Sequence, residues 1–153
     1  MVQNVFFSFF VIGFITFTSV HSDVNLDPVE KVYVNNYDSF YNFMTNYNPA
    51  GKRLNAYCYG SRNETHDSWC GDCINAEPYI DEALEKFGQN TIMLFVDVGS
   101  KAEWKDIENN YLRMNCYLDF IPTLIHYEGL YQMKRIEDIH VQNPELLKWF
   151  FNE

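Results

Sequence analysis

A long helix that begins at two cysteines, directly after a strand, is the feature that most constrains how this chain folds. Apolar residues recur at helical spacing over residues 70–87, and Cys70 and Cys73 lie in the first turn. Residues 54–59, LNAYCY, have the composition of a strand, and a polar loop over residues 60–68 separates them from the cysteines. A strand followed by a helix is the repeating unit of α/β proteins, so the sequence predicts that class.

Strand-like and helix-like segments also alternate in the rest of the chain. Further strands are expected over residues 31–34, 91–98, 123–127 and 131–135, the last two forming a hairpin. Further helices are expected after a cap at Asp38, over residues 102–113, and over residues 144–151 after a cap at Asn143. Segment 91–98 is almost entirely apolar, which predicts a central strand. Together these elements predict a mixed central β-sheet flanked by helices on both faces.

The charge of the chain excludes one class of partner. The sequence has 21 acidic and 11 basic residues, which gives a net charge of −10. Nucleic acid and anionic lipid surfaces repel such a protein, so we expect no nucleic acid as a partner. A membrane would be a partner only if the N-terminal segment anchored the chain in it.

The N-terminal segment resembles a secretory leader. The first 22 residues have no Asp, Glu, Lys or Arg, and residues 5–20 form a Phe-rich apolar run. A membrane span needs about 20 apolar residues, so this run is short for a span and fits the core of a signal peptide. Small residues before Asp23 predict cleavage there, which gives a leader over residues 1–22 and one domain over residues 23–153. A retained anchor is the alternative, because no Lys or Arg precedes the apolar run.

A cleaved leader predicts a protein that is secreted or lies in the lumen of the secretory pathway, where disulfides persist. The sequon Asn63-Glu64-Thr65 lies in the polar loop before the cysteines. It makes Asn63 a candidate for glycosylation in that compartment.

Three roles compete for the pair Cys70 and Cys73. A zinc site needs four ligands, and the other two cysteines, Cys58 and Cys116, are isolated in the sequence, so no metal is expected. A purely structural disulfide is not expected either, because a bridge across so short a loop adds little stability. The favoured role is a redox couple that works without a bound cofactor. Whether Cys58 and Cys116 pair with each other stays open.

The start of the helix explains why Cys70 would react. Backbone N–H groups there have no partner within the helix, and the helix dipole favours a negative charge beside them. Cysteines of CxxC motifs accordingly have thiol pKa values of roughly 3.5 to 7.5 instead of about 8.5. We therefore expect Cys70 to be an exposed thiolate that attacks a disulfide, and Cys73 to resolve the mixed disulfide.

The motifs around the cysteines resemble those of the thioredoxin family, and in particular its small thioredoxin-related members. They are Trp69-Cys70-Gly71-Asp72-Cys73, Pro78 inside the following helix, and Ile121-Pro122-Thr123. The resemblance runs from about residue 31 to the C-terminus. It implies a thioredoxin fold and a protein-disulfide oxidoreductase, acting as a reductase or an oxidase on protein or small-molecule disulfides. It also implies a recycling reductase or oxidase, and the cytosolic location of the close relatives is the alternative to secretion.

The resemblance also implies roles for single residues. Cys70 would be the nucleophile, Cys73 the resolving thiol and Pro122 a cis-proline. The loop over residues 60–68 would be longer than the corresponding loop of thioredoxin itself. It would therefore allow fewer proteins to bind as partners. Beside the proline, Ile121 is expected to offer its backbone to a substrate, and Trp69 to shield the cysteines and contact substrate.

Two residues depart from the family pattern. Gly71 stands where relatives have proline, which loosens the turn between the cysteines. Tyr57 stands where thioredoxins have a buried aspartate, so another acid would have to accept the proton of Cys73. Glu77 is the first candidate and Asp72 the second, although the charge of Asp72 also opposes a thiolate next to it.

The sequence therefore supports two functions. The first is a disulfide oxidoreductase that uses Cys70 and Cys73. The second is a secreted thioredoxin-fold binding module without turnover, in which the two cysteines stay closed in a disulfide. Mixed disulfides trapped through Cys70 would distinguish the enzyme from the binding module.

Overall fold

The computed structural model describes residues 27–65 and 67–152. The leader expected over residues 1–22 and its boundary with the domain lie outside the described residues. Within the part of the chain that is described, no helix is long and apolar enough to cross a membrane.

Five strands form one sheet in the order β1-β3-β2-β4-β5. They are β1 (Glu30–Val34), β2 (Arg53–Tyr59), β3 (Thr91–Asp97), β4 (Thr123–Glu128) and β5 (Tyr131–Glu137). Strands β1, β3 and β2 run parallel, whereas β4 is antiparallel to β2 and β5 to β4. The predicted mixed sheet and hairpin are confirmed. The prediction that segment 91–98 is a central strand is confirmed, since β3 lies between β1 and β2 and is largely buried. Strand β2, which leads to the cysteines, occupies the middle of the sheet.

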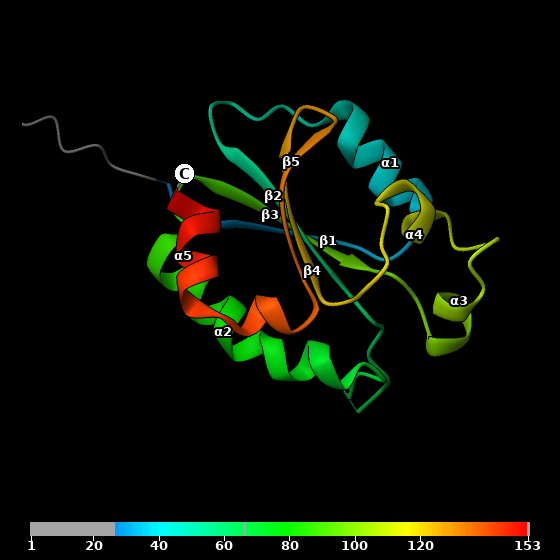
Figure 1. Ribbon diagram of the computed structural model, residues 1–153. Coiled ribbons are helices and arrows are strands. Elements are labelled where there is room, and N and C mark those ends of the chain that lie inside the picture. Colours follow the sequence, from blue (N-terminus) through cyan, green and yellow to red (C-terminus); the bar gives the residue numbers. More distant parts are fainter. Residues whose placement is uncertain (1–26, 66, 153) are drawn as a thin grey trace, which may run out of the picture.

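Helices cover both faces of this sheet, as predicted (Figure 1). They are α1 (Tyr37–Asn46), α2 (Gly71–Phe87), α3 (Lys101–Lys105), α4 (Tyr111–Asn115), α5 (Pro144–Asn152) and the 3-10 helix η1 (Asp138–Gln142). Alternate residues of β2 face opposite layers. Cys58 packs in the cluster that contains Phe40 of α1 and Leu112 of α4. Tyr57 packs in the cluster that contains Ile80 of α2 and Phe150 of α5.

The first helix begins two residues earlier than predicted. Asn36, not Asp38, is the N-cap, and its side-chain oxygen accepts a hydrogen bond from the backbone N–H of Ser39 (2.8 Å). Asp38 lies in the first turn, where its charge is favourable beside the positive end of the helix dipole.

The single helix predicted over residues 102–113 is wrong, because Asn110 divides it into α3 and α4. The Asn110 side chain donates to the carbonyl oxygens of Val98 (2.9 Å) and Glu103 (3.2 Å) and accepts from the N–H of Arg113 (2.9 Å). A side chain that bonds the backbone in this way competes with the helix and serves as a cap instead. The cap predicted at Asn143 is confirmed, since its side chain accepts from the N–H of Glu145 (3.0 Å).

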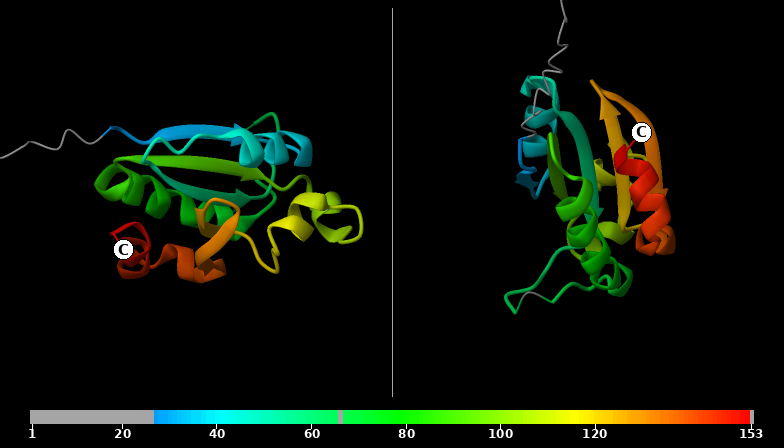
Figure 2. Two further views of the ribbon diagram at one scale, coloured as in Figure 1. Left: turned by 90° about the horizontal axis from the view of Figure 1, so that it is seen from above. Right: turned by 90° about the vertical axis from the view of Figure 1, so that its left-hand side faces the viewer.

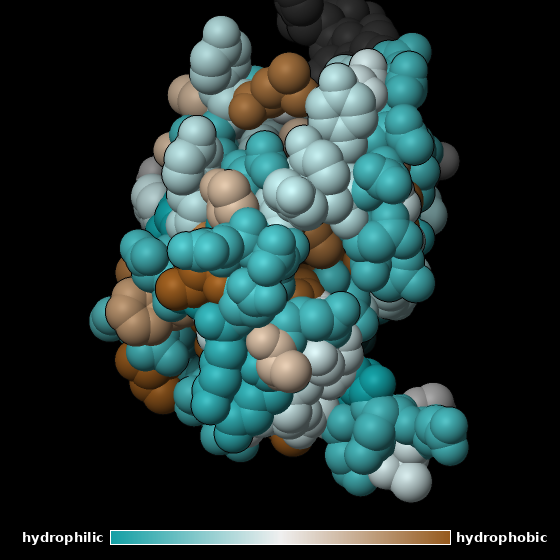
Figure 3. All heavy atoms as spheres, turned by 90° about the vertical axis from the view of Figure 1, so that its right-hand side faces the viewer, coloured by the Kyte–Doolittle hydropathy of each residue, from teal (hydrophilic) through white to brown (hydrophobic). Residues whose placement is uncertain are grey.

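The side of the molecule with α3 and α4 is mostly hydrophilic (Figure 3). Hydrophobic side chains appear there as smaller patches among hydrophilic and intermediate ones. Such a surface agrees with the net charge of −10.

Candidate active site

Cys70 and Cys73 are joined by a disulfide at the start of α2. The S–S distance is 2.07 Å and the two Cα atoms lie 5.2 Å apart. Cys73 is fully buried and only 6% of Cys70 is exposed. The expectation of an exposed Cys70 is therefore wrong for this disulfide state. The Cys70 sulfur lies between the first turn of α2 and the carbonyl oxygen of Ile121, and both shield it from water.

Cys70 is the N-cap of α2, and its sulfur takes the place that a Ser or Asp oxygen usually has. The backbone N–H of Cys73 donates to the Cys70 sulfur at 3.2 Å, and the N–H of Ile74 donates to the Cys70 carbonyl oxygen at 3.1 Å. The N–H of Cys73 is one of the helix donors without a partner in the helix itself. A negative charge on Cys70 would accept this bond more strongly than the neutral sulfur does.

The proline loop lies directly against this sulfur. The peptide bond between Ile121 and Pro122 is cis, and the Ile121 carbonyl oxygen lies 3.8 Å from the Cys70 sulfur. Thr123 follows at the start of β4, where its hydroxyl donates to the carbonyl oxygen of Phe120 (2.7 Å). The structure thus places the CxxC pair beside the proline loop, although the two motifs lie more than forty positions apart in the sequence.

Trp69 is fixed between two loops. Its Nε1–H donates to the carbonyl oxygen of Gly99 at 2.9 Å. Its ring lies so close to Gly60 that a Cβ on that residue would be 2.7 Å from a ring carbon. Gly60 therefore admits no side chain unless the Trp69 ring moves.

The loop that precedes Trp69 is tied to the end of β3. Ser61 donates its N–H to Gly99 (3.0 Å) and its hydroxyl to the Asp97 carboxylate (2.5 Å). The loop stands out from the domain (Figure 2, right). Asn63 lies in it as an exposed residue, and its side-chain oxygen accepts from the N–H and the hydroxyl of Thr65 (3.0 and 2.8 Å).

Two residues that support the active site were not predicted from the sequence. The Ser68 hydroxyl accepts the N–H of Cys70 (3.2 Å) and donates to the carbonyl oxygen of Gly60 (2.9 Å). Gly99, with φ of 96°, accepts from both Ser61 and Trp69. A glycine directly after a strand signals such a turn, but nothing in the sequence shows which groups its carbonyl oxygen would meet.

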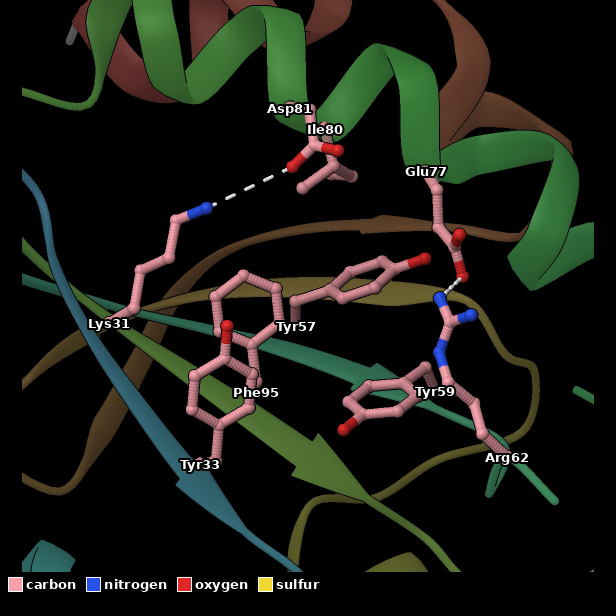
Figure 4. A pocket seen from close by; sticks show the side chains of 9 residues that line it. All are labelled: Lys31, Tyr33, Tyr57, Tyr59, Arg62, Glu77, Ile80, Asp81 and Phe95. Carbon is pink, nitrogen blue, oxygen red and sulfur yellow. Dashed lines mark hydrogen bonds and ion pairs between the residues drawn. The ribbon is translucent and has the colours of Figure 1, made fainter. Parts of the chain in front are cut away.

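A pocket of about 230 Å³ lies between the sheet and α2 (Figure 4). Aromatic side chains from three neighbouring strands line it, and an ion pair lies at each end. The aromatic residues are Tyr33, Tyr57, Tyr59 and Phe95. The ion pairs are Lys31 with Asp81 (3.9 Å) and Arg62 with Glu77.

Tyr57 connects this pocket to the active site. Its hydroxyl donates to the carbonyl oxygen of Cys73 at 3.4 Å, and its ring is buried. Burial, and to a smaller extent the nearby charge of Glu77, raise the pKa of Tyr57 well above its usual value of 10. The hydroxyl therefore keeps its proton at neutral pH and can only donate to Cys73.

The structure places the two candidate acids differently. The Glu77 carboxylate pairs with the Arg62 guanidinium at the end of the pocket where the Tyr57 hydroxyl lies. Asp72 is exposed in the first turn of α2. Gly71 is exposed between the two cysteines, and a Cβ added to it would meet no atom within 4 Å.

Comparison with known proteins agrees with this geometry. The family model described as "Thioredoxin domain-containing protein 17-like, thioredoxin domain" matches residues 33–153. Thioredoxin domain-containing protein 17 of Homo sapiens is 32% identical over 118 residues, which are 77% of this chain and 94% of that protein. The protein of the same name from Danio rerio is 34% identical over 102 residues, 67% of this chain and 80% of that protein.

A solved structure supports the fold. A chain from the crystal structure of a ferredoxin:thioredoxin reductase and thioredoxin f2 complex superposes with a TM-score of 0.55 at 19% identity, covering 83% of this chain and 96% of that chain. At this identity the likeness concerns the fold alone, and it confirms the expected thioredoxin fold. The chain is a thioredoxin-like domain with a CxxC pair, and it belongs to the thioredoxin domain-containing protein 17-like family.

Proposed function

We propose that this protein is a thiol–disulfide oxidoreductase that exchanges disulfides with proteins or small molecules through Cys70 and Cys73. The observation that carries the proposal is the hydrogen bond from the N–H of Cys73 to the Cys70 sulfur, at the start of a helix of 17 residues. This N–H and the helix dipole stabilise a thiolate, and the thiolate is the form of cysteine that attacks disulfides.

The first step begins from the dithiol. The Cys70 thiolate attacks one sulfur of the substrate disulfide, so that a bond from Cys70 to this sulfur forms while the substrate S–S bond breaks. The other substrate sulfur leaves as a thiolate and takes a proton from solvent. The backbone of Ile121 and Pro122, which lies beside Cys70, is the surface on which the substrate would lie, with Trp69 at its side.

The second step closes the disulfide that the structure contains. Cys73 loses its proton and attacks the Cys70 sulfur, which releases the second substrate sulfur as a thiolate. The substrate has then gained two electrons, and the enzyme has lost them. We assign Glu77 as the acceptor of the Cys73 proton, with Asp72 as the second candidate, because both lie on the first turns of α2.

A partner must restore the dithiol before the next cycle. A reductase dithiol supplying two electrons would do so, and the complex of a thioredoxin f2 with a reductase gives one example of such a pair in this fold. If the compartment is oxidising, the same exchange steps run in reverse, and the Cys70–Cys73 disulfide oxidises a substrate dithiol.

Trapping of mixed disulfides tests this proposal. In Cys73→Ser the second step is blocked, so substrates should stay attached through Cys70 and should be released by dithiothreitol. The variant Cys70→Ser should trap nothing, whereas Cys58→Ser should turn over insulin disulfides as the unaltered protein does. If Cys73→Ser traps no partner and the unaltered protein does not reduce insulin, a binding module with a closed disulfide is favoured. The low exposure of Cys70 also allows that function.

We further propose that the protein enters the secretory pathway and is glycosylated at Asn63. The leader-like sequence and the exposure of Asn63 on the projecting loop support this proposal. Expression in eukaryotic cells should yield a product that begins at Asp23 and loses mass on treatment with an N-glycosidase. The variant Asn63→Gln should lack this mass change. A product found only in the cytosol with its leader intact would contradict the proposal.

A further inference from the structure

The pocket between the sheet and α2 has two walls of different chemistry that face each other (Figure 4). On α2, Glu77 and Asp81 lie four positions apart and point from the helix toward the sheet, which forms an acidic wall. Opposite them, strands β1, β2 and β3 supply an aromatic wall of four rings, Tyr33, Tyr57, Tyr59 and Phe95. The proposed disulfide exchange uses Glu77 and gives no role to the space between the walls.

The rings of the aromatic wall are held by contacts with one another. Tyr33 stacks on Phe95 with ring centroids 4.9 Å apart, and Tyr57 stacks on Tyr59 with centroids 5.8 Å apart. Burial, and to a smaller extent the nearby charge of Asp97, raise the pKa of Tyr59 to about 12. Since the pKa of Tyr57 is raised as well, both hydroxyls keep their protons at neutral pH. The wall therefore consists of neutral rings, whose faces attract cations and repel anions.

An ammonium group already lies at this pocket, on the side chain of Lys31. Its Nζ is 5.7 Å from the centroid of the Phe95 ring and 3.9 Å from the Asp81 carboxylate. A carboxylate and aromatic rings are groups with which a protein attracts an organic cation. The ion pair is a weak one, because the Lys31 and Asp81 side chains are 40% and 73% exposed. Lys31 can therefore give up its place beside Asp81 to another cation.

The charges of the pocket do not favour an anion. Lys31 and Arg62 line the pocket as well, but each pairs with a carboxylate of the acidic wall. An anion that approached either cation would therefore also approach Asp81 or Glu77, and the faces of the rings. The net charge of −10 on the chain acts in the same direction, since it raises the local concentration of cations.

We propose that this pocket binds a small organic cation from solution, an alkylammonium compound with a short apolar body. Its nitrogen would lie between the Asp81 carboxylate and the ring of Tyr33, in place of the Lys31 ammonium, and its methyl or methylene groups would contact the aromatic wall. The pocket volume of about 230 Å³ is smaller than the roughly 300 to 1,000 Å³ of sites for drug-sized ligands, so the ligand has about the size of choline. This binding goes beyond the proposed disulfide exchange and does not depend on it.

An NMR titration with choline tests the proposal. The isotope-labelled full chain in its disulfide form is titrated while choline chloride replaces sodium chloride, which keeps the ionic strength constant. Saturable shifts of backbone amides are expected in β1, in β3 and in the middle of α2, with a dissociation constant of about 1 to 10 mM. The alcohol 3,3-dimethylbutanol has the shape of choline without its charge, and it should bind at least about fivefold more weakly.

Variants of the Lys31–Asp81 pair should change choline binding in opposite directions. Asp81→Asn removes the carboxylate and should weaken binding about two- to fivefold, whereas Lys31→Gln removes the competing ammonium and should strengthen it by a similar factor. Glu82→Gln is the matched control. It removes the same charge from α2 at a residue that pairs with Lys86 and does not line this pocket, so binding should not change.

Tyr33 separates the effect of an aromatic ring from that of the charges. Its side chain is 65% exposed, so Tyr33→Phe and Tyr33→Leu should both fold. Tyr33→Phe keeps the ring and should bind choline as the unaltered chain does, whereas Tyr33→Leu should bind about two- to fivefold more weakly.

Three results would each overturn the proposal. They are the absence of saturable shifts with up to about 50 mM choline, equal affinities for choline and 3,3-dimethylbutanol, and tighter binding of benzoate than of choline. Weaker choline binding by Lys31→Gln would also contradict it, because the ammonium of Lys31 would then assist the ligand. The titration needs no catalytic turnover, so its result is independent of the oxidoreductase assay.

Discussion

The backbone N–H of Cys73 donates to the sulfur of Cys70 at 3.2 Å. Within one turn of α2, the two cysteines are thus joined both by a hydrogen bond and by a disulfide. The disulfide opens when the protein is reduced, whereas we expect the N–H to stay in place, because it belongs to the backbone of a helix of 17 residues. The donor is therefore in place before Cys70 ionises, and a thiolate formed there needs no rearrangement of the backbone.

Removal of the charge next to the nucleophile should make Cys70 more acidic. Asp72 lies in the first turn of α2, where its carboxylate repels a Cys70 thiolate. In Asp72→Asn we expect the pKa of Cys70 to fall by about 0.2 to 0.7 units, the size of a single charge effect at a helix end. The rate of alkylation by iodoacetamide as a function of pH measures this shift. The matched variant Asp81→Asn, further along α2, should leave the Cys70 pKa unchanged.

A proline at position 71 should stabilise the protein. Gly71 is the first residue of α2, a Cβ there would meet no atom within 4 Å, and Cys70 before it is extended, as a residue before proline prefers. Gly71→Pro should therefore raise the free energy of unfolding by about 0.4 to 1 kcal/mol, because it restricts the unfolded chain. Urea denaturation of the oxidised protein measures this change. A loss of stability would show that the turn needs the freedom of glycine.

Loss of the Tyr57 hydroxyl should destabilise the domain. In Tyr57→Phe the carbonyl oxygen of Cys73 loses the donor it has at 3.4 Å, and we expect a decrease of about 0.5 to 1.5 kcal/mol in the free energy of unfolding. Tyr59→Phe, on the same strand and also lining the pocket, is the matched control and should change stability less. Equal effects of the two variants would show that the bond from Tyr57 to Cys73 contributes nothing specific.

Acid should destabilise the protein through His126. Burial and the nearby charge of Lys134 lower the pKa of His126, and its Nδ1 lies 2.8 Å from the side-chain oxygen of Asn55. The folded protein thus binds fewer protons than the unfolded chain, whose histidine pKa is about 6.5, so stability should fall as the pH drops from about 7.5 to 5.5. Urea denaturation across this range measures the slope. His126→Gln should reduce it, and His140→Gln, at an exposed position, should not.

The outline of the fold was predictable because it depends on local patterns. Alternating apolar segments predict the strands, and the cap at Asn143 predicts the last helix. The division of segment 102–113 was not predictable, since it depends on bonds from the Asn110 side chain to distant Val98. Likewise, the central place of β2 results from strand pairing, which composition does not determine.

The candidate site was predictable only in part, for the same reason. The CxxC pair and the proline loop are visible as motifs in the sequence. The burial of Cys70 and the bond from Tyr57 to Cys73 both result from the packing of separate elements. No local pattern of residues reports such contacts.

The acidity of Cys70 tests the central claim most directly. The reduced protein would be alkylated over a range of pH, and the modified cysteine identified in peptide 63–86 by mass spectrometry, with Cys70→Ser as the control. We predict that Cys70 reacts as a thiolate with a pKa below about 7.5 and that Cys73 does not. A pKa of about 8.5 or higher for both cysteines would contradict the claim that the helix start activates Cys70.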